Sequence, residues 1–285
     1  MSPGVLFVVS TPIGHLGDFS FRGVEVLRRA DLVAAEDTRR TRRLLAHYGI
    51  QARVVSLHAH SRPEAAERLL DRVGAGEAVA YVTDAGTPGV SDPGAALVEA
   101  AHRRGLGVVP VPGASAVLAA LAASGFPADR FVFLGFLPRK GASRAALLER
   151  VAGERWTAVC YEAPGRAAAL LRDLATRCGA GRPAAVAREL TKLHEELRRG
   201  TLAELAAYYV EHPPRGEVTV VVGGLAGDEE AAPVATAPVA GRTAADTAVV
   251  VAALRAEGLA PGAIAKELAR RLGIPRQRAY RLLDA

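Results

Sequence analysis

The chain has 285 residues, of which 50% are hydrophobic and 23% are charged, a composition that excludes a disordered chain. The one disulfide that two cysteines could form cannot hold together a fold of this size, so a disulfide scaffold is excluded. No apolar run reaches the length of about 18 residues that a transmembrane helix needs, so a membrane span is also excluded. The net charge of +6 permits a polyanionic partner, and the absence of a basic leader before residues 5–9 predicts a cytoplasmic protein without a signal peptide.

In the first 110 residues, short apolar runs alternate with helical patterns. The alternation predicts a largely parallel sheet with helices on its faces. Strands that are buried on both faces are continuous apolar runs, as these are. The expected strands are residues 6–9, 32–35, 54–57, 79–83 and 107–111, and the expected helices are residues 22–29, 39–48, 64–72 and 93–103.

A second alternating half follows the turn-rich segment 124–129. We therefore predict an α/β protein with two lobes, residues 1–123 and 124–223. The Ala-, Pro- and Gly-rich segment 224–240 has no periodicity and is expected to be a linker. The expected strands of the second lobe are residues 131–136, 156–161, 184–188 and 218–223, and its expected helices are residues 142–151, 166–176 and 201–210.

Residues 241–285 are expected to form a small basic helical domain. Three short helical patterns cover residues 243–257, 261–272 and 275–283, and they resemble a helix-turn-helix. The segment contains seven Arg and one Lys against two Asp and two Glu. A packing or dimerisation module and a nucleic-acid contact both remain open for it.

Three loops contain more Gly and Pro than a simple connection requires. They span residues 10–18, 83–94 and 110–116, each at the carboxyl end of an expected strand. Open α/β sheets bind ligands at that edge, so the loops predict a small-molecule cleft. The glycine signatures of dinucleotide and P-loop sites are absent, as is zinc-ligand spacing. His58 and His60 would face one side of a strand, but a structural or substrate-contacting pair is favoured over a metal site.

A polar segment, Glu36-Asp37-Thr38, follows the expected strand 32–35. Carboxylates at a strand end can orient a hydroxyl group or accept its proton, and the Thr38 hydroxyl could cap the next helix. That helix begins with four arginines that could contact phosphates. A capped and solvated helix is the alternative reading of the same residues. The arginines are Arg39, Arg40, Arg42 and Arg43.

Eight segments, in chain order, resemble one known family. They are STPIGHLGD, AAEDTRRTRRLL, SLHAH, VTDAGTPGVSDPG, PVPGASAVLAAL, GFLPRK, YEAPGR and ARELTK. The chain from about Leu6 to Gly223 is thereby similar to the ribosomal RNA small subunit methyltransferase I family, in the tetrapyrrole-methylase-like superfamily. The most visible departure is His15, where that family usually has Asn.

The resemblance implies a fold, a reaction and partners. The fold is a two-lobed α/β subunit with S-adenosylmethionine in the cleft between the lobes. The reaction is 2′-O-methylation of a cytidine in the decoding region of 16S rRNA, with the 30S subunit as substrate and a homodimer as the assembly. The alternatives are a tetrapyrrole methyltransferase and a ligand-sensing DNA-binding regulator.

The reaction that the resemblance implies directs the choice of candidate site residues. A base is useful because a ribose hydroxyl is a poor nucleophile until its proton leaves. The candidates for this role are Glu36, Asp37, Glu189 and Lys192, with His58 and His60 as less favoured alternatives. The candidate phosphate contacts are Arg39, Arg40, Arg42, Arg43, Arg139 and Lys140. The implied cofactor-binding residues are Pro12, Gly14, Asp84, Ala85, Gly86, Val90, Asp92, Ser115, Ala116, Tyr161, Glu162, Leu190 and Thr191.

Overall fold

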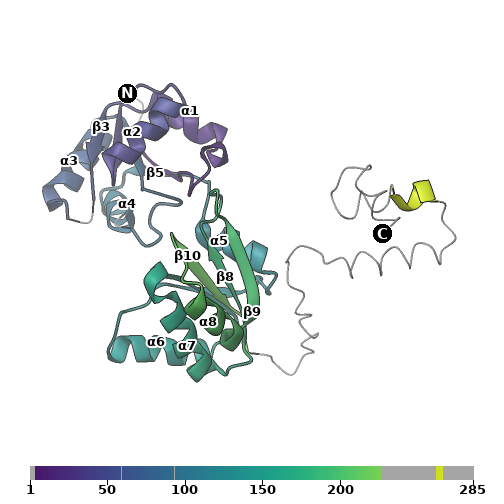
Figure 1. Cartoon of the computed structure of the whole chain (residues 1–285). Coiled ribbons are helices and arrows are strands. Elements are labelled where there is room, and N and C mark those ends of the chain that lie inside the picture. The colour runs from purple at the N-terminus through teal and green to yellow at the C-terminus, as the bar shows by residue number, and fades with distance from the viewer. Residues whose placement is uncertain (1–3, 59, 93, 226–260, 266–285) are drawn as a thin grey trace. The chain divides into compact units, whose positions relative to one another are not determined.

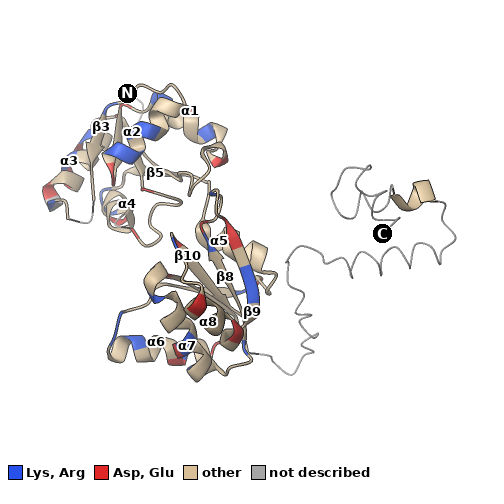
Figure 2. Cartoon of the chain, in the orientation of Figure 1, with Lys and Arg blue, Asp and Glu red and all other residues tan. Residues whose placement is uncertain are grey.

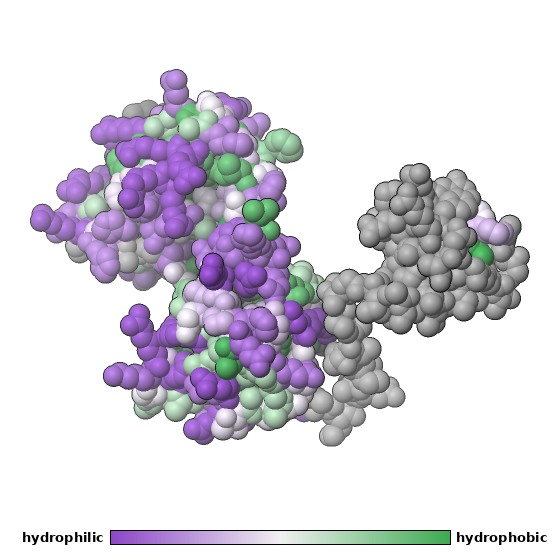
Figure 3. Space-filling view, in the orientation of Figure 1, coloured by the Kyte–Doolittle hydropathy of each residue, from purple (hydrophilic) through white to green (hydrophobic). Residues whose placement is uncertain are grey.

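The structure is a computed structural model that describes residues 4–58, 60–92, 94–225 and 261–265. Two five-stranded sheets, each with helices against both faces, are found in residues 4–225 (Figure 1). The outer surface seen in Figure 3 is largely hydrophilic, because the apolar side chains lie between helices and sheets. Within the described ranges, no helix has the length and apolar character needed to cross a bilayer.

The first sheet has the strand order β3-β2-β4-β1-β5, and all its neighbouring strands are parallel. The predicted parallel sheet is thus confirmed, and no strand bound differs from the expected one by more than one residue. Since all five strands run the same way, their carboxyl ends meet at one edge. The strands are β1 (Val5–Val9), β2 (Leu32–Ala35), β3 (Val54–Ser56), β4 (Ala78–Val82) and β5 (Gly107–Val111).

Helices cover both faces of this sheet, which explains why most of its strand residues are apolar. Helices α1 (Phe21–Arg29) and α2 (Thr38–His47) pack on one face through side chains such as Leu27 and Leu44. Helices α3 (Pro63–Gly74) and α4 (Gly94–Arg103) pack on the other through Leu70 and Leu97. Each fully buried leucine of this kind stabilises the fold by about 1.5–3 kcal/mol.

The second sheet is mixed, with the order β6-β7-β10-β8-β9. Strands β6 (Phe131–Phe136) and β7 (Thr157–Glu162) are parallel, but β10 (Val218–Val222) runs antiparallel to both β7 and β8 (Pro183–Arg188). Strand β9 (Glu196–Thr201), at the sheet edge, was not expected from the sequence. Its sequence ELRRGT lacks alternating apolar residues, and a charged edge of this kind discourages pairing with other chains.

Helices α6 (Ala142–Ala152), α7 (Ala167–Cys178) and α8 (Leu202–Glu211) cover one face of the second sheet. Helix α5 (Ala116–Ser124) covers the other, where Val117 and Leu121 pack against Val159 and Val221. The lobe boundary expected after residue 123 falls at the last residue of α5 and so assigns the helix to the first lobe, but the core contacts of α5 are with the second sheet. The linker beyond residue 225 and the expected helical domain at 241–285 lie outside the described residues, apart from helical residues 261–265.

Candidate active site

Four loops meet at the carboxyl edge of the first sheet. They follow β1, β2, β4 and β5, and hydrogen bonds from backbone and side-chain groups join them to one another. Thr11 and Gly86 exchange two such bonds, with N–O distances of 2.9 and 3.0 Å. The Thr87 hydroxyl donates to the carbonyl of Ala114 at 3.2 Å. The three Gly/Pro-rich loops expected to form a cleft are therefore held together as one surface.

A cavity of about 500 Å³ lies against this surface, and the second sheet supplies its other wall. Its volume is within the usual range for a small-molecule site. Residues from both lobes line it: Ile13, Glu36, Arg40, Thr83, Asp84, Ala85, Gly86, Thr87, Val90, Ser91, Asp92, Ser115, Ala116, Phe136, Tyr161, Glu162, Ala163, Pro164, Ala187, Leu190, Gly216, Glu217, Val218 and Thr219.

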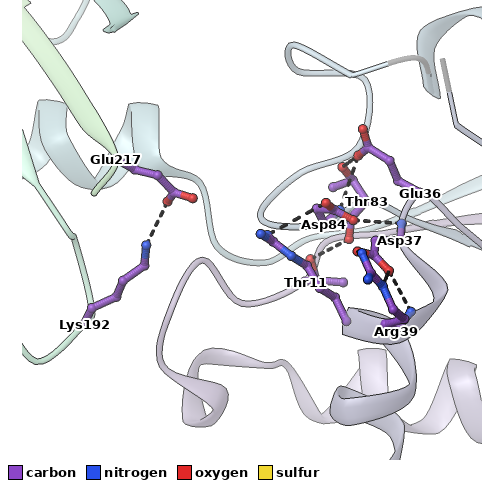
Figure 4. Close-up of polar contacts among 9 residues, drawn as sticks. Thr11, Glu36, Asp37, Arg39, Thr83, Asp84, Lys192 and Glu217 are labelled. Atoms are coloured by element: carbon purple, nitrogen blue, oxygen red, sulfur yellow. Dashed lines mark hydrogen bonds and ion pairs between the residues drawn. The ribbon is translucent and has the colours of Figure 1, made fainter. Parts of the chain in front are cut away.

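Two carboxylates from neighbouring strand ends lie together in the cavity wall (Figure 4). Glu36 Oε2 accepts a hydrogen bond from the Thr83 hydroxyl at 2.8 Å, and Asp84 Oδ1 accepts one from the backbone N–H of Asp37 at 2.8 Å. Partial burial and the nearby negative charge of Glu36 raise the pKa of Asp84, although Arg40, at 3.8 Å, partly offsets them. Asp84 is therefore a better proton acceptor than an ordinary aspartate.

Asp37, the next residue after Glu36, has a different role. Its side chain caps α2 by accepting from the N–H of Arg39 at 2.8 Å, and it pairs with the guanidinium of that residue. These hydrogen bonds lower the pKa of Asp37 to about 2, so it is a poor base. The cap expected from Thr38 is thus supplied by Asp37, while the Thr38 hydroxyl accepts from Arg42 at 3.3 Å.

Asp92 shapes the loop after β4. Its carboxylate accepts hydrogen bonds from the backbone N–H groups of Gly89, Val90 and Gly94, at 2.6, 3.1 and 2.6 Å. Ser91, beside it, has a φ of 62°, a conformation that costs a non-glycine residue energy and that tends to occur at functional sites. The loop is thereby fixed with Val90 and Ser91 facing the cavity.

On the opposite wall, Glu162 ends β7 and is only 1% exposed. Its Oε1 accepts from the N–H of Ala163 at 2.8 Å and pairs with Arg166. Its Oε2 is buried without a hydrogen-bond partner among the described residues, with Arg144 4.0 Å away. An unsatisfied buried carboxylate oxygen is costly, so this atom is suited to accept a hydrogen bond from a ligand.

The two lobes touch where the loop after β1 meets the turn that follows β8. The N–H of His15 donates to Thr191 Oγ1 at 3.0 Å. A Cβ atom on Gly14 would lie 2.5 Å from Lys192 Cγ, so only glycine fits there without displacement. Glu189 and Thr191 have φ angles of 50° and 65°, which places backbone strain at this contact.

Lys192 is held between two carboxylates, Glu189 at 2.8 Å and Glu217 at 3.1 Å. Figure 4 shows the pair with Glu217. Partial burial disfavours the ammonium, but these hydrogen bonds outweigh it and raise the pKa of Lys192. The bond from Lys192 in turn lowers the pKa of Glu189. Both groups are therefore charged at neutral pH, which makes Lys192 and Glu189 weak candidates for a base.

The structure brings most of the expected cofactor-binding residues to the cavity, together with Glu36 and Arg40. The exceptions are Pro12, Gly14 and Thr191, which are not among its lining residues. The other basic candidates, Arg39, Arg42, Arg43, Arg139 and Lys140, are exposed outside it. His58 and His60 were expected on a strand, but β3 ends at Ser56, so they lie in the following turn, where the N–H of His60 donates to His58 Nδ1.

Several residues that line the cavity are not among the predicted site residues. Thr83, Thr87 and Ser91 lie in the Gly/Pro-rich segment 83–94, which is predicted to border the cleft. Their closeness in sequence to Asp84 and Asp92 is a signal that could have identified them. Residues 216–219 had no such signal. They precede or begin β10, and because β10 runs antiparallel to its neighbours, its amino end reaches the carboxyl ends of β7 and β8.

The charges of the cavity are strongly unequal. Among the described residues that line it, Arg40 is the only basic side chain, against five carboxylates. A pocket of this kind favours a ligand that carries positive charge and hydrogen-bond donors. The carboxylates are Glu36, Asp84, Asp92, Glu162 and Glu217.

Comparisons with known proteins agree on one family. The profile of the family described as Tetrapyrrole (Corrin/Porphyrin) Methylases matches residues 5–206. A protein from Synechocystis sp. that is named "Ribosomal RNA small subunit methyltransferase I" is 44% identical over 98% of this chain and 97% of its own length. A protein of the same name from Xylella fastidiosa (strain Temecula1) is 46% identical over 98% of both chains. A uroporphyrin-III C-methyltransferase from Thermus thermophilus, solved with S-adenosylhomocysteine, shares the fold at a TM-score of 0.55 and 23% identity, covering 77% of this chain and 97% of that one. The chain therefore belongs to the tetrapyrrole methylase family and, within it, to the ribosomal RNA small subunit methyltransferase I group.

Proposed function

We propose that this protein transfers the methyl group of S-adenosylmethionine to the ribose 2′-oxygen of a cytidine in the decoding region of 16S rRNA, in the cytoplasm and on the 30S subunit. The observation that carries the proposal is the acidic cavity between two lobes of this family's fold. The relatives named above act on ribosomal RNA by name, and a structural neighbour binds the demethylated cofactor.

The cavity suits S-adenosylmethionine on chemical grounds. The cofactor carries a sulfonium and an ammonium against one carboxylate, and the cavity is rich in carboxylates. Glu162 Oε2 offers a buried acceptor for an amino or ammonium donor. We assign the binding to Asp84, Ala85, Gly86, Val90, Ser115, Ala116, Tyr161, Glu162 and Leu190, with Pro12, Gly14, Asp92 and Thr191 supporting the loops. When bound, the sulfonium supplies an activated methyl group.

Glu36 is the base that we favour. It lines the cavity, and among the described residues no hydrogen-bond donor contacts its Oε1. Thr83 holds the other oxygen, which orients the carboxylate. Asp37 is committed to the helix cap, and Glu189 and Lys192 are committed to each other. Glu36 can therefore take the proton of a hydroxyl group that enters the cavity, with Asp84 next to it.

The exposed arginines of α2 supply the contacts to RNA phosphates in this proposal. Figure 2 shows basic residues along α2, the helix that begins two residues after Glu36. Arg139 and Lys140, exposed in the loop after β6, add positive charge on the other lobe. Phosphates would thus be bound outside the acidic cavity. A tetrapyrrole acid fits less well, since it would bring further carboxylates to the cavity.

We also propose a homodimer that uses α5. Its sequence, AVLAALAAS, is apolar around the whole helix, whereas a surface helix normally has a polar face. Leu118 is 55% exposed, and Ala122 and Ala123 are exposed on the same side. A second copy of the chain would cover this face.

The test is methyl transfer from labelled S-adenosylmethionine to 30S subunits that lack native methylation, followed by nucleoside mass spectrometry. The expected product is 2′-O-methylcytidine. Glu36→Gln should bind the cofactor normally but transfer methyl about 10²- to 10⁴-fold more slowly, while Glu25→Gln, a matched change at an exposed residue of α1, should behave as wild type. Methylation at another atom or nucleotide would reject the stated target, and a failure to bind the cofactor would reject the whole proposal.

A further inference from the structure

The segment Gly135–Lys140, which reads GFLPRK, contains a feature that the proposed reaction does not yet use. Its first two residues end β6, where the pairing with β7 shifts register between Phe133 and Phe136. Gly135 has a φ of +62°, which this local irregularity requires. Irregularities of this kind redirect a side chain, and they are common beside active sites.

The redirected side chain is that of Phe136. It lines the cavity and yet is 56% exposed, which is unusual for a phenylalanine. Its ring centroid lies 5.3 Å from that of Tyr161, which is itself 5.0 Å from that of Phe133. The three rings form a continuous aromatic series, in which Phe133 and Tyr161 are partly buried and Phe136 faces solvent.

The first lobe completes the surroundings of Phe136. A Cβ atom on Gly135 would lie 3.5 Å from Ser91 Oγ, so the loop after β4 reaches β6 at this point. Val90, 36% exposed, also lines the cavity. Arg139 and Lys140 follow three and four residues after Phe136 and are exposed. An open aromatic face that shares a cavity with an aliphatic side chain, with two exposed cations three and four residues further along the chain, is suited to a nucleobase and its phosphates.

We propose that Phe136 stacks on the base of the target nucleotide and so holds its ribose at the entrance of the cavity. The inference rests on the proposed function, which requires a nucleotide to leave its stack and enter a pocket. Phe136 meets the substrate rather than the adenine of the cofactor because it is the outer ring of the series. Tyr161, which is partly buried, is placed to contact the cofactor.

The test compares Phe136→Ala, Phe136→Trp and Phe21→Ala. Phe21 begins α1, is 93% exposed and is not among the cavity residues, so its variant controls for loss of an exposed phenyl ring. For each variant we would measure kcat/KM on 30S subunits, KM for the subunits, and Kd for S-adenosylmethionine by calorimetry. A melting curve for each variant checks that it is folded.

Phe136→Ala should lower kcat/KM for 30S subunits by about 5- to 150-fold, the range found when a base-stacking ring is removed. Cofactor Kd should stay at the wild-type value, and Phe136→Trp should restore most of the loss. The inference is overturned if Phe136→Ala matches Phe21→Ala, or if it weakens cofactor binding as much as it weakens turnover. A wild-type protein that methylates no rRNA would overturn the proposed function, and this inference with it.

Discussion

Replacing Gly14 by Ala tests whether the contact between the two lobes controls the cavity. The new Cβ atom would lie 2.5 Å from Lys192 Cγ, 2.7 Å from Thr191 Oγ1 and 3.2 Å from the carbonyl oxygen of Leu190. Carbon atoms in contact are normally about 3.5–4.0 Å apart. The loop after β1 and the turn after β8 must therefore separate by about 1 Å.

The neighbours of Gly14 cannot all yield without cost. Lys192 is held by Glu189 and Glu217, and Thr191 Oγ1 accepts the hydrogen bond from His15. Overpacking of this kind typically costs about 1–3 kcal/mol. If the closed contact is needed to bind the cofactor, that cost weakens S-adenosylmethionine binding by about 5- to 150-fold. Without the cofactor the two segments can remain apart, which relieves the overlap, and the hydrophobic core of each lobe lies elsewhere, so the melting temperature of the free protein should fall little.

The assay is calorimetric titration of Gly14→Ala with S-adenosylmethionine, together with thermal melts. Gly181→Ala is the control, because a Cβ atom there meets nothing within 4 Å and the residue does not have a positive φ. Wild-type affinity in Gly14→Ala would refute the reasoning, since it would mean that the lobes separate by 1 Å without any effect on the site. A large loss in Gly181→Ala would show that glycine replacement alone causes the effect.

Three further predictions concern single features. Burial and the charge of Glu36 raise the pKa of Asp84 above its ordinary value of 3.8. Ionised Asp84 therefore destabilises the folded state, and this cost grows as the pH rises from 3.8 through the raised pKa. Asp84→Asn should therefore melt at a higher temperature than wild type at pH 7, with a smaller difference near pH 4, and should bind S-adenosylmethionine more weakly. Leu118→Glu should convert a dimer to monomers in sedimentation equilibrium, because it places a charge on the apolar face of α5. The double variant Arg42→Gln, Arg43→Gln should weaken 30S binding and reduce the slope of log Kd against log salt by about 1 to 2, whereas an unchanged slope would remove α2 from the RNA contact.

The first sheet could be predicted from sequence because its inner strands, β1, β2 and β4, are largely buried on both faces. Such strands are apolar runs, and helices with one apolar side separate them. The second sheet was harder to predict. Strand β9 has a polar sequence, and the direction of β10 depends on contacts between distant segments rather than on local pattern. Residues 216–219 were missed in the cavity for this reason.

The same limit applies to side-chain roles. From the sequence, Glu36, Asp37, Glu189 and Lys192 are all candidates for the base. The sequence cannot rank them, because a residue type does not reveal which hydrogen-bond partners its side chain has. The structure separates them by those partners. Asp37 caps a helix, and Lys192 neutralises Glu189, while Glu36 keeps one oxygen unoccupied by the described residues. His15, where the family usually has Asn, caps the short helix η1 (Leu16–Asp18) by accepting from the N–H of Gly17 through Nδ1, a role that the side chain of Asn also fills.

The junction between β2 and α2 divides two regions of opposite charge. Glu36 faces the cavity, where it joins four other carboxylates, and Arg39, Arg42 and Arg43 are exposed on the helix that follows. A cationic cofactor is therefore favoured inside, and a polyanion is favoured outside. On the proposed function, the phosphates of the RNA would be repelled from the cavity that its ribose hydroxyl must reach. Such a charge boundary favours an approach in which only the uncharged sugar and base enter, so that the nucleophile is presented without its neighbouring phosphates.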